Sequence, residues 1–277
     1  MKAALAEIIL YPVKSLGGVS VKSAEVEPWG LRHDRRWLVL NPDGTVLTAR
    51  RERRMLALTA APLESGAISL TSPGATSLEV EVPSSAAAPL PLLLSRLDSV
   101  RRAAPEASAW LSAQLRREVT LGWLDDPGRR SVSITHGGRP GDTLNLADAG
   151  PLLMTSSASL RQLNTWIVLD SSEAGAEQPN EISMRRFRPN VVVGGEMPPF
   201  IEDTWTIVQV GGVHFRMGEP CDRCVMTTID PETLLGGKQP LRTLARHRQW
   251  NHKTWFGLRL IPEKVGPIMV GDEVTGS

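Results

Sequence analysis

Both cysteines of this chain lie in Gly218-Glu219-Pro220-Cys221-Asp222-Arg223-Cys224-Val225-Met226-Thr227-Thr228-Ile229-Asp230-Pro231-Glu232, three positions apart. A thiolate is a soft ligand suited to zinc, copper, iron–sulfur or molybdenum-type centres, and a neighbouring cation favours the thiolate form. Arg223 stands between the two thiols, and hydroxyls and a carboxylate follow within a few residues. The stretch is therefore the first candidate for a metal or redox site.

A single Cys-x-x-Cys leaves three readings open. A structural zinc site needs a second ligand pair, which among the five histidines could come at close spacing only from His247 and His252. A thioredoxin-like pair needs a helix after the first cysteine, and the β-prone run 225–229 argues against one. The remaining reading is a pair of buried, inert thiols, which the residues alone favour.

The charge balance argues against nucleic acid as a partner. Lys and Arg number 31 against 30 Asp and Glu, so no bulk positive field attracts a polyanion. The arginines are unevenly spread, however, and a cluster of them is either a solvated face or an anion pocket. The clustered residues are Arg32, Arg35, Arg36, Arg50, Arg51, Arg53 and Arg54.

The composition also predicts a cellular compartment. Two cysteines form no disulfide framework, which suits a reducing environment. Glu7 comes too early for a secretory leader, and no apolar run approaches about 18 residues, so we expect no membrane span. We therefore expect a cytoplasmic protein.

Alternating and β-branched residues predict a strand-rich fold with few helices. The first half should be a small, mostly antiparallel β-unit with strands at 6–13, 19–26, 36–40, 45–49, 67–70 and 78–82, the third and fourth forming a hairpin. Three helices are expected. The first spans 105–117, with Ala109, Leu111 and Leu115 on its apolar face. The second follows capping residues at 155–157, and the third spans 240–250. A loop is expected at 171–179, and later strands at 191–195, 206–210, 213–217, 258–261 and 268–274. We expect no Ser-His-Asp, Gly-rich phosphate-loop or His-Glu-x-x-His site.

Several separated motifs together resemble one family. They are Tyr11-Pro12-Val13-Lys14-Ser15, Gly30-Leu31, Asp34-Arg35-Arg36-Trp37-Leu38-Val39, Thr48-Ala49-Arg50, Phe187-Arg188-Pro189-Asn190, Asp203-Thr204-Trp205 and the cysteine stretch as far as Thr233. In this order they resemble MOSC-domain proteins with an N-terminal β-barrel domain, the family of the mitochondrial amidoxime-reducing component and its bacterial relatives. The resemblance implies an α+β, β-rich fold with an N-terminal β-barrel-like domain at 1–118, a MOSC β-barrel at 119–277 and a cofactor in the cleft between them.

The resemblance implies a molybdenum cofactor, a pyranopterin dithiolene with one terminal phosphate and no nucleotide. Cys224 matches the metal-binding cysteine, although the spacing alone could not choose it over Cys221. The phosphate-binding positions are matched by Lys14, Ser15 and Arg35. The pterin positions are matched by Asp148, Arg188 and Asn190, with Arg223 beside the metal ligand. Asp230 matches an acid of the metal pocket and is the candidate for proton handling.

These residue types suit that cofactor. Two cations and a hydroxyl are charge-assisted donors for a phosphate, and amide, carboxylate and guanidinium groups can pair with pterin edges. The plainer readings are surface charges for Lys14 and Arg35, a turn cap for Asp148 and a surface ion pair for Arg188. Ala149-Gly150 after Asp148 departs from the mitochondrial relatives, so pterin contacts there would have to come from the backbone.

The implied activity is reduction of N-hydroxylated small molecules such as amidoximes, hydroxamic acids and N-hydroxylated bases; the family is also associated with detoxification and pyridoxal phosphate binding. The alternatives are a carrier of molybdenum cofactor or sulfur, with a persulfide on Cys224, and a β-rich binding module with inert thiols. Two cysteines cannot supply a four-cysteine iron–sulfur cluster, and no nucleotide fingerprint or appended ferredoxin domain is seen. We therefore expect electrons from a separate reductase or small redox protein, which the basic segment 50–54 could meet.

Overall fold

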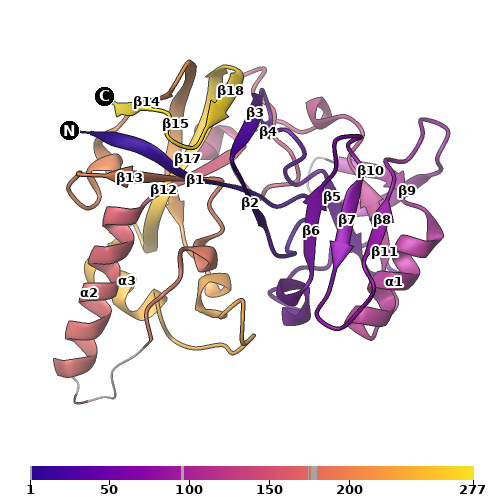
Figure 1. The fold of residues 1–277 in the computed structure, drawn as a ribbon, viewed down its shortest axis with the longest axis horizontal. Coiled ribbons are helices and arrows are strands. Elements are labelled where there is room, and N and C mark those ends of the chain that lie inside the picture. The colour runs from indigo at the N-terminus through magenta and orange to yellow at the C-terminus, as the bar shows by residue number, and fades with distance from the viewer. Residues whose placement is uncertain (1, 95–96, 174, 176–179) are drawn as a thin grey trace.

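The computed structural model describes residues 2–94, 97–173, 175 and 180–277. In this part of the chain, strands outnumber helices, and the elements form two bodies side by side (Figure 1). One body holds the orange and yellow strands of the C-terminal half together with the indigo strand β1. The other holds the purple strands and helix α1. The strand-rich α+β expectation is confirmed.

The larger body is built on a nine-stranded sheet. In order across the sheet, its strands are β19 (Val274–Gly276), β14 (Ile207–Val210), β15 (Val213–Asp222), β17 (Lys253–Lys264), β12 (Leu152–Ser156), β13 (Val191–Gly195), β1 (Ala3–Leu10) and β2 (Val19–Val21), with β16 (Gln249–Trp250) beside β17. Neighbouring strands are antiparallel except β12 and β13. The sheet curls back on itself, because Leu5 N donates to Asp272 O at 2.8 Å just before β19. This closure gives the barrel character.

Strand β1 packs with the C-terminal half although it begins the chain. Leu5 and Ile8 are fully buried in the same hydrophobic cluster as Met154, Phe215 and Leu260. A small sheet extends this cluster, with strands β18 (Gly266–Met269), β3 (Ser23–Glu27) and β4 (Gly30–Leu31). The chain therefore crosses between the two bodies early, which places the residues after β1 at their junction.

The smaller body contains two antiparallel sheets around a second hydrophobic cluster. The first is formed by β5 (Trp37–Leu40), β11 (Thr120–Trp123), β10 (Leu97–Arg102) and β9 (Pro89–Leu94), and the second by β6 (Thr59–Pro62), β7 (Ile68–Thr71) and β8 (Leu78–Val80). Ile229, which follows the cysteine stretch, is buried in this cluster and so ties the C-terminal half to it.

Three α-helices cover these sheets: α1 (Pro105–Leu115), α2 (Ser157–Glu173) and α3 (Leu241–His247). Helix α1 begins with Pro105 in its first turn and ends where Arg116 takes a left-handed conformation, φ 53°. Its buried face is Ala107, Leu111 and Leu115, spaced four apart, so the expected Ala109 was wrong and lies on the exposed face. Ser156 Oγ accepts from Ser159 N at 3.1 Å, in line with the expected caps at 155–157.

Some boundaries differ from the sequence expectations. Helix α3 ends at His247, earlier than expected, because Gln249 and Trp250 pair with β17. The expected hairpin of 36–40 and 45–49 is present only as a short contact: Leu40 and Val46 form a single antiparallel bridge, and Leu47 N donates to Val39 O at 2.8 Å. The longer ladder of β5 is with β11. Of the expected loop 171–179, Glu173 still belongs to α2, and residues 174 and 176–179 lie outside the described residues.

Six 3₁₀ turns join these elements in the described residues: η1 (Arg53–Ala57), η2 (Pro127–Arg129), η3 (Ile134–His136), η4 (Met184–Phe187), η5 (Ile201–Thr204) and η6 (Val225–Thr228). The turn η6 lies directly after Cys224, where the β-prone residues predicted an extended segment. The hydroxyls of Thr227 and Thr228 donate to the carbonyls of Cys224 and Val225 at 3.0 and 2.8 Å, which favours a tight turn over an extended strand.

Candidate functional site

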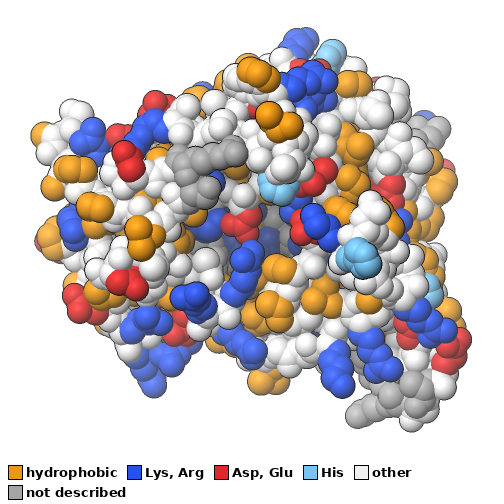
Figure 2. All heavy atoms as spheres, turned by 180° about the vertical axis from the view of Figure 1, so that it is seen from behind, with side chains coloured by type: hydrophobic (Ala, Val, Ile, Leu, Met, Phe, Trp, Pro, Cys, Tyr) orange, Lys and Arg blue, Asp and Glu red, His pale blue; other side chains and the backbone are white. Residues whose placement is uncertain are grey.

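A cavity of about 350 Å³ lies between the two bodies. Lys14, Ser15, Arg35 and Arg50 line it from the N-terminal segments, and the cysteine stretch lines it from the C-terminal half. In the space-filling view, Lys and Arg side chains surround a hollow near the middle of one face (Figure 2). All the site residues expected from the sequence line this cavity except Asp230.

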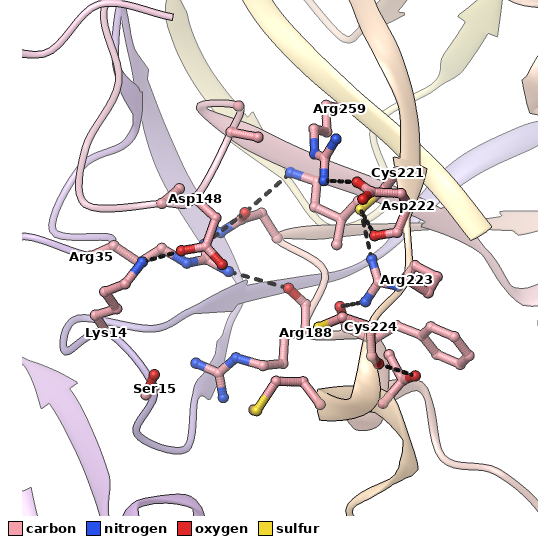
Figure 3. Close-up of a pocket in the computed structure, with 18 of the residues that line it drawn as sticks. Lys14, Ser15, Arg35, Asp148, Arg188, Cys221, Asp222, Arg223, Cys224 and Arg259 are labelled. Carbon is pink, nitrogen blue, oxygen red and sulfur yellow. Dashed lines mark hydrogen bonds and ion pairs between the residues drawn. The ribbon is translucent and has the colours of Figure 1, made fainter. Parts of the chain in front are cut away.

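One end of the cavity holds Lys14, Ser15 and Arg35 (Figure 3). Ser15 and Arg35 take left-handed conformations, φ 71° and 46°, which non-glycine residues adopt at a cost. The loop is held in place because Lys14 N donates to Trp37 O and Arg35 N to Tyr11 O, both at 2.8 Å. The strained turns therefore aim two cations and a hydroxyl into one space.

Asp148 faces these cations from the opposite half. It forms an ion pair with Lys14, and its Oδ2 accepts from Arg50 Nη2 at 2.9 Å. The Lys14 charge lowers the pKa of Asp148 well below its ordinary value, outweighing the opposite effect of burial. Because the Asp148 side chain lies open to the cavity, solvent weakens this pairing. This single carboxylate cannot balance the several cations around it, so this end of the cavity stays positively charged.

Asn190 and Arg35 connect the two halves directly. Arg35 Nη1 donates to Asn190 Oδ1 at 2.9 Å, and Leu153 N donates to the same oxygen at 3.2 Å. Asn190 Nδ2 donates in turn to Ile9 O at 3.3 Å. Asn190 is almost fully buried, so its amide fixes the cavity wall through contacts within the protein.

Arg188 stands in the same wall with its guanidinium unpaired. Its backbone is left-handed, φ 55°, at the end of η4. The guanidinium carbon lies 4.3 Å from the centre of the Tyr11 ring, and that of Arg35 lies 4.8 Å from it. Burial lowers the pKa of Arg188 to about 10, yet in the described residues its guanidinium donates no hydrogen bond to protein and forms no ion pair. Arg188 is therefore free to meet a ligand.

The two cysteines have different surroundings. Cys221 is buried, and Arg223 Nη1 donates to its sulfur at 2.8 Å. Cys224 is exposed to the cavity and begins η6. Arg223 therefore points its side chain at Cys221 and at Phe187 O, 2.6 Å away, rather than at Cys224. The thiol open to a ligand is that of Cys224.

Asp230 lies outside the cavity lining. Its Oδ2 accepts from Arg186 Nη2 at 2.7 Å, and its Oδ1 accepts from the backbone N of Glu232 and Thr233 at 2.9 and 3.1 Å. Burial raises the pKa of Asp230, but these hydrogen bonds and Arg186 outweigh it and lower the pKa. In this geometry the carboxylate shapes the turn after η6 and holds Arg186, which itself lines the cavity.

Two arginines of the site, Arg186 and Arg259, were not predicted from the sequence, and a third, Arg50, was predicted only as part of a cluster that forms a solvated face, an anion pocket or a docking surface. Arg50 lies beside Cys224: burial lowers the pKa of Arg50, but the charges of Asp148 and Cys224 outweigh this and raise it. Arg259 Nη2 donates to Asp222 Oδ1 at 2.6 Å, and Arg186 pairs with Asp230. Arg50 belongs to a motif that could have revealed it, whereas Arg259 reaches the site only through the β15–β17 pairing.

The surroundings of His247 bear on the hypothesis of a structural zinc site. His247 stacks on Trp166, with ring centres 4.5 Å apart, and its Nε2 lies 3.3 Å from Asp170, on the helical side of the larger body. In residues 2–94, 97–173, 175 and 180–277, no three His, Cys, Asp or Glu side chains form a group that could hold a metal. Within the same residues, no helix is both long and apolar enough to cross a membrane.

Comparison with known proteins places this arrangement in a family. Residues 2–118 match the MOSC N-terminal beta barrel domain, and residues 141–275 match the MOSC domain. Mitochondrial amidoxime-reducing component 1 of Mus musculus is 31% identical over 290 residues, which are 98% of this chain and 81% of that protein. The chain belongs to the MOSC family, together with the amidoxime-reducing components. The protein of the same name from Homo sapiens is also 31% identical, over 98% of this MOSC protein and 82% of its own length.

Another MOSC relative carries a different name. Molybdenum cofactor sulfurase of Oryza sativa is 32% identical over 286 residues, which are 98% of this chain but 34% of the sulfurase. The two names, a reductase component and a sulfurase, correspond to two of the three functions that the sequence left open for this MOSC protein, the reductase and the carrier.

Proposed function

We propose that this MOSC protein holds a molybdenum cofactor in the cavity between its two bodies and reduces N-hydroxylated small molecules. The observation that carries the proposal is the separation of two kinds of group along one cavity. Lys14, Ser15 and Arg35 stand at one end, and the exposed thiol of Cys224 stands at the other (Figure 3). A ligand with an anionic tail and a metal at its far side matches this polarity.

The cation end suits a phosphate. Lys14 and Arg35 offer charged donors, Ser15 offers a hydroxyl, and all three line the cavity. Asp148 forms an ion pair with Lys14. A phosphate that bound here would compete with Asp148 for Lys14, leaving the carboxylate to accept from a pterin N–H.

The middle of the cavity suits a flat heterocycle. The unpaired guanidinium of Arg188 can donate to ring nitrogens or carbonyls. On the opposite side, Gly150 packs against Arg259, whose Cβ would lie 3.0 Å from any Cβ added there. Ala149 and Gly150 both line the cavity, so their backbone would have to supply the contacts that side-chain hydroxyls cannot make here.

The thiol end suits a metal. Cys224 is exposed to the cavity, and the Arg50 guanidinium lies beside its sulfur. Cys221 is buried against Arg223, which makes it a structural partner of that arginine in this proposal. When bound, the molybdenum cofactor would supply the two-electron reduction of the N–O bond, while the protein positions it and excludes competing reactions.

The activity is tested by supplying benzamidoxime and an artificial one-electron donor to purified protein. Formation of benzamidine that depends on Cys224 supports the reductase. A protein that holds molybdenum cofactor but forms no benzamidine, and instead passes cofactor or sulfur to an acceptor protein, supports the carrier function suggested by the sulfurase relative. Absence of both cofactor and benzamidine formation would contradict the proposal.

A further inference from the structure

A second cavity, of about 390 Å³, lies beside the first. The two share a wall formed by Arg186, Arg188 and Met226, and Met226 is two residues from Cys224. Residues of both halves of the chain line the second cavity, among them Leu56 and Thr59 from the N-terminal half and Ile229 from the C-terminal half. It has the size of a small-molecule site and adjoins the proposed metal thiol.

The lining of this cavity is divided between apolar side chains and polar or charged groups. Leu56 and Ile229 are buried side chains, and Pro231 and the Tyr11 ring add further nonpolar surface. Such walls bind a flat hydrocarbon or aromatic body by removing its surface from water. Cavity walls of this kind provide affinity, so the polar groups among them decide which molecules are accepted.

The polar groups that remain available are mainly donors. Arg185 is engaged with Glu7 at 3.2 Å and Arg186 with Asp230 at 2.7 Å, so each is balanced by a carboxylate. Among the described residues the Arg188 guanidinium has no such partner, and Arg186 Nε and Tyr11 Oη are buried without a hydrogen bond. Glu232, at the exposed rim, is the one acid in the lining.

We propose that this second cavity is the substrate subsite and that it takes an aromatic or compact apolar body carrying a carbonyl or anionic group directed at Arg188. Hydroxamic acids and related acyl compounds fit this description better than cationic amidine-like compounds. The Arg188 guanidinium is a cation in the wall between the two cavities, and its five N–H donors can serve the heterocycle in the first cavity and a ligand in the second. The inference rests on the proposed function in assigning the first cavity to the cofactor, which leaves the second one for the substrate.

The test uses benzoate and benzamidine, two probes of similar shape and opposite charge that cannot be reduced at an N–O bond. Binding of each to the protein as purified, with its cofactor, is measured by calorimetry. We expect benzoate to bind at least about tenfold more tightly than benzamidine. Equal binding, or tighter binding of benzamidine, would overturn the assignment of ligand charge.

A matched pair of variants locates the binding. Thr59 lines the second cavity but not the first, and it lies in strand β6, where either substitution suits the backbone. Thr59→Phe should fill the cavity and weaken benzoate binding by at least about tenfold, whereas Thr59→Val, of nearly equal volume, should change it less than about twofold. Molybdenum and pterin content should stay unchanged in both. Benzoate binding that Thr59→Phe leaves intact would place the ligand elsewhere, for example among the arginines of the first cavity.

A measurement on the unmodified chain avoids the risk that Thr59→Phe folds poorly. Ile229 lines the second cavity and not the first, whereas Ile8 is buried in the hydrophobic cluster of the larger body and lines neither cavity. In carbon-labelled protein, benzoate should shift the Ile229 methyl resonance and leave that of Ile8 in place. An unmoved Ile229 resonance at saturating benzoate would overturn the subsite.

The subsite and the proposed function can fail separately. Benzamidoxime reduction in a protein whose benzoate binding ignores Thr59→Phe would remove the subsite and keep the reductase. Benzoate binding that Thr59→Phe abolishes, in a protein that reduces no N-hydroxylated compound, would keep the binding site and remove the reductase.

Discussion

Arg35 Nη1 donates a hydrogen bond to Asn190 Oδ1 at 2.9 Å, across 155 residues of sequence. The same guanidinium donates from Nη2 to Arg188 O at 3.3 Å. One arginine of the N-terminal half thus holds the wall that the C-terminal half contributes to the cavity. The cation end of the site is therefore held in place by hydrogen bonds within the protein.

Replacing Lys14 by Met should lower cofactor content without unfolding the protein. The variant keeps the apolar stem and removes the ammonium, and losing one charge-assisted contact to a buried anion costs about 1.5–3 kcal/mol. Pterin and molybdenum per mole of protein should fall roughly tenfold wherever binding is not saturated. Lys22→Met, which removes an exposed lysine outside the cavity, is the matched control.

Arg35→Ala should have the larger effect, because it removes a phosphate donor and also the hydrogen bond to Asn190. Full cofactor content in the Lys14→Met/Arg35→Ala double variant would exclude both residues from the site.

Asp230→Asn separates a structural role from proton handling. The asparagine keeps a side-chain oxygen for the Glu232 and Thr233 amides but loses the charge that pairs with Arg186. We expect lower thermal stability and a modest drop in the rate of benzamidoxime reduction, with the shape of the pH–rate profile unchanged. If a limb of that profile disappears in Asp230→Asn, the carboxylate handles a proton after all.

Acidification should reveal the Asp148 pairing. The Lys14 charge lowers the pKa of Asp148 in the folded protein, so the stability that this carboxylate contributes is present above its unfolded pKa, about 3.9, and is lost as the pH falls through the folded value. Free energies of unfolding in urea, measured from pH 6 down to pH 2, should therefore fall less steeply below about pH 4 for Asp148→Asn than for the unmodified protein. An equal or steeper fall in the variant would show that the ion pair contributes nothing.

The electron source should be a separate protein. The chain has two cysteines in all, of which one is assigned to the metal, whereas a plant-type iron–sulfur cluster takes four. Purified protein mixed with NADH or NADPH and an amidoxime should therefore not consume the nicotinamide, and a reductase system should restore turnover. Steady nicotinamide oxidation by the purified protein alone would reveal an internal electron path.

The positions of the candidate site residues were accessible from sequence to differing degrees. Lys14, Arg35 and Cys224 belong to local motifs, and they line one cavity as the order of the motifs suggested. Arg259 carries no local signal, because it reaches the cavity through the pairing of β15 with β17. Asp230 lies just after η6, close to the cavity as expected, but its carboxylate already accepts hydrogen bonds from two backbone amides and Arg186.

The fold, like the site, could be predicted from the sequence only where the signal is local. The hairpin of β14 and β15 follows from adjacent alternating segments with Gly211-Gly212 between them. On one side β1 pairs with β2, but its partner on the other side is β13, about two thirds of the chain away, and local alternation contains no information about such pairing. At 225–228 even the local structure was predicted wrongly. Side-chain hydrogen bonds from Thr227 and Thr228 favour a turn there, although the residues have a high β preference.

The most direct test is the molybdenum content of purified protein from a host that makes the cofactor, compared among the unmodified chain, Cys224→Ala and Cys221→Ala. The exposure of Cys224 and the burial of Cys221 predict that the unmodified protein and Cys221→Ala hold molybdenum and reduce benzamidoxime. Cys224→Ala should lose the metal–thiolate bond and nearly all activity. If Cys221→Ala is inactive and Cys224→Ala is active, the two cysteines have been assigned the wrong way round. If the unmodified protein holds no molybdenum, the central claim is contradicted.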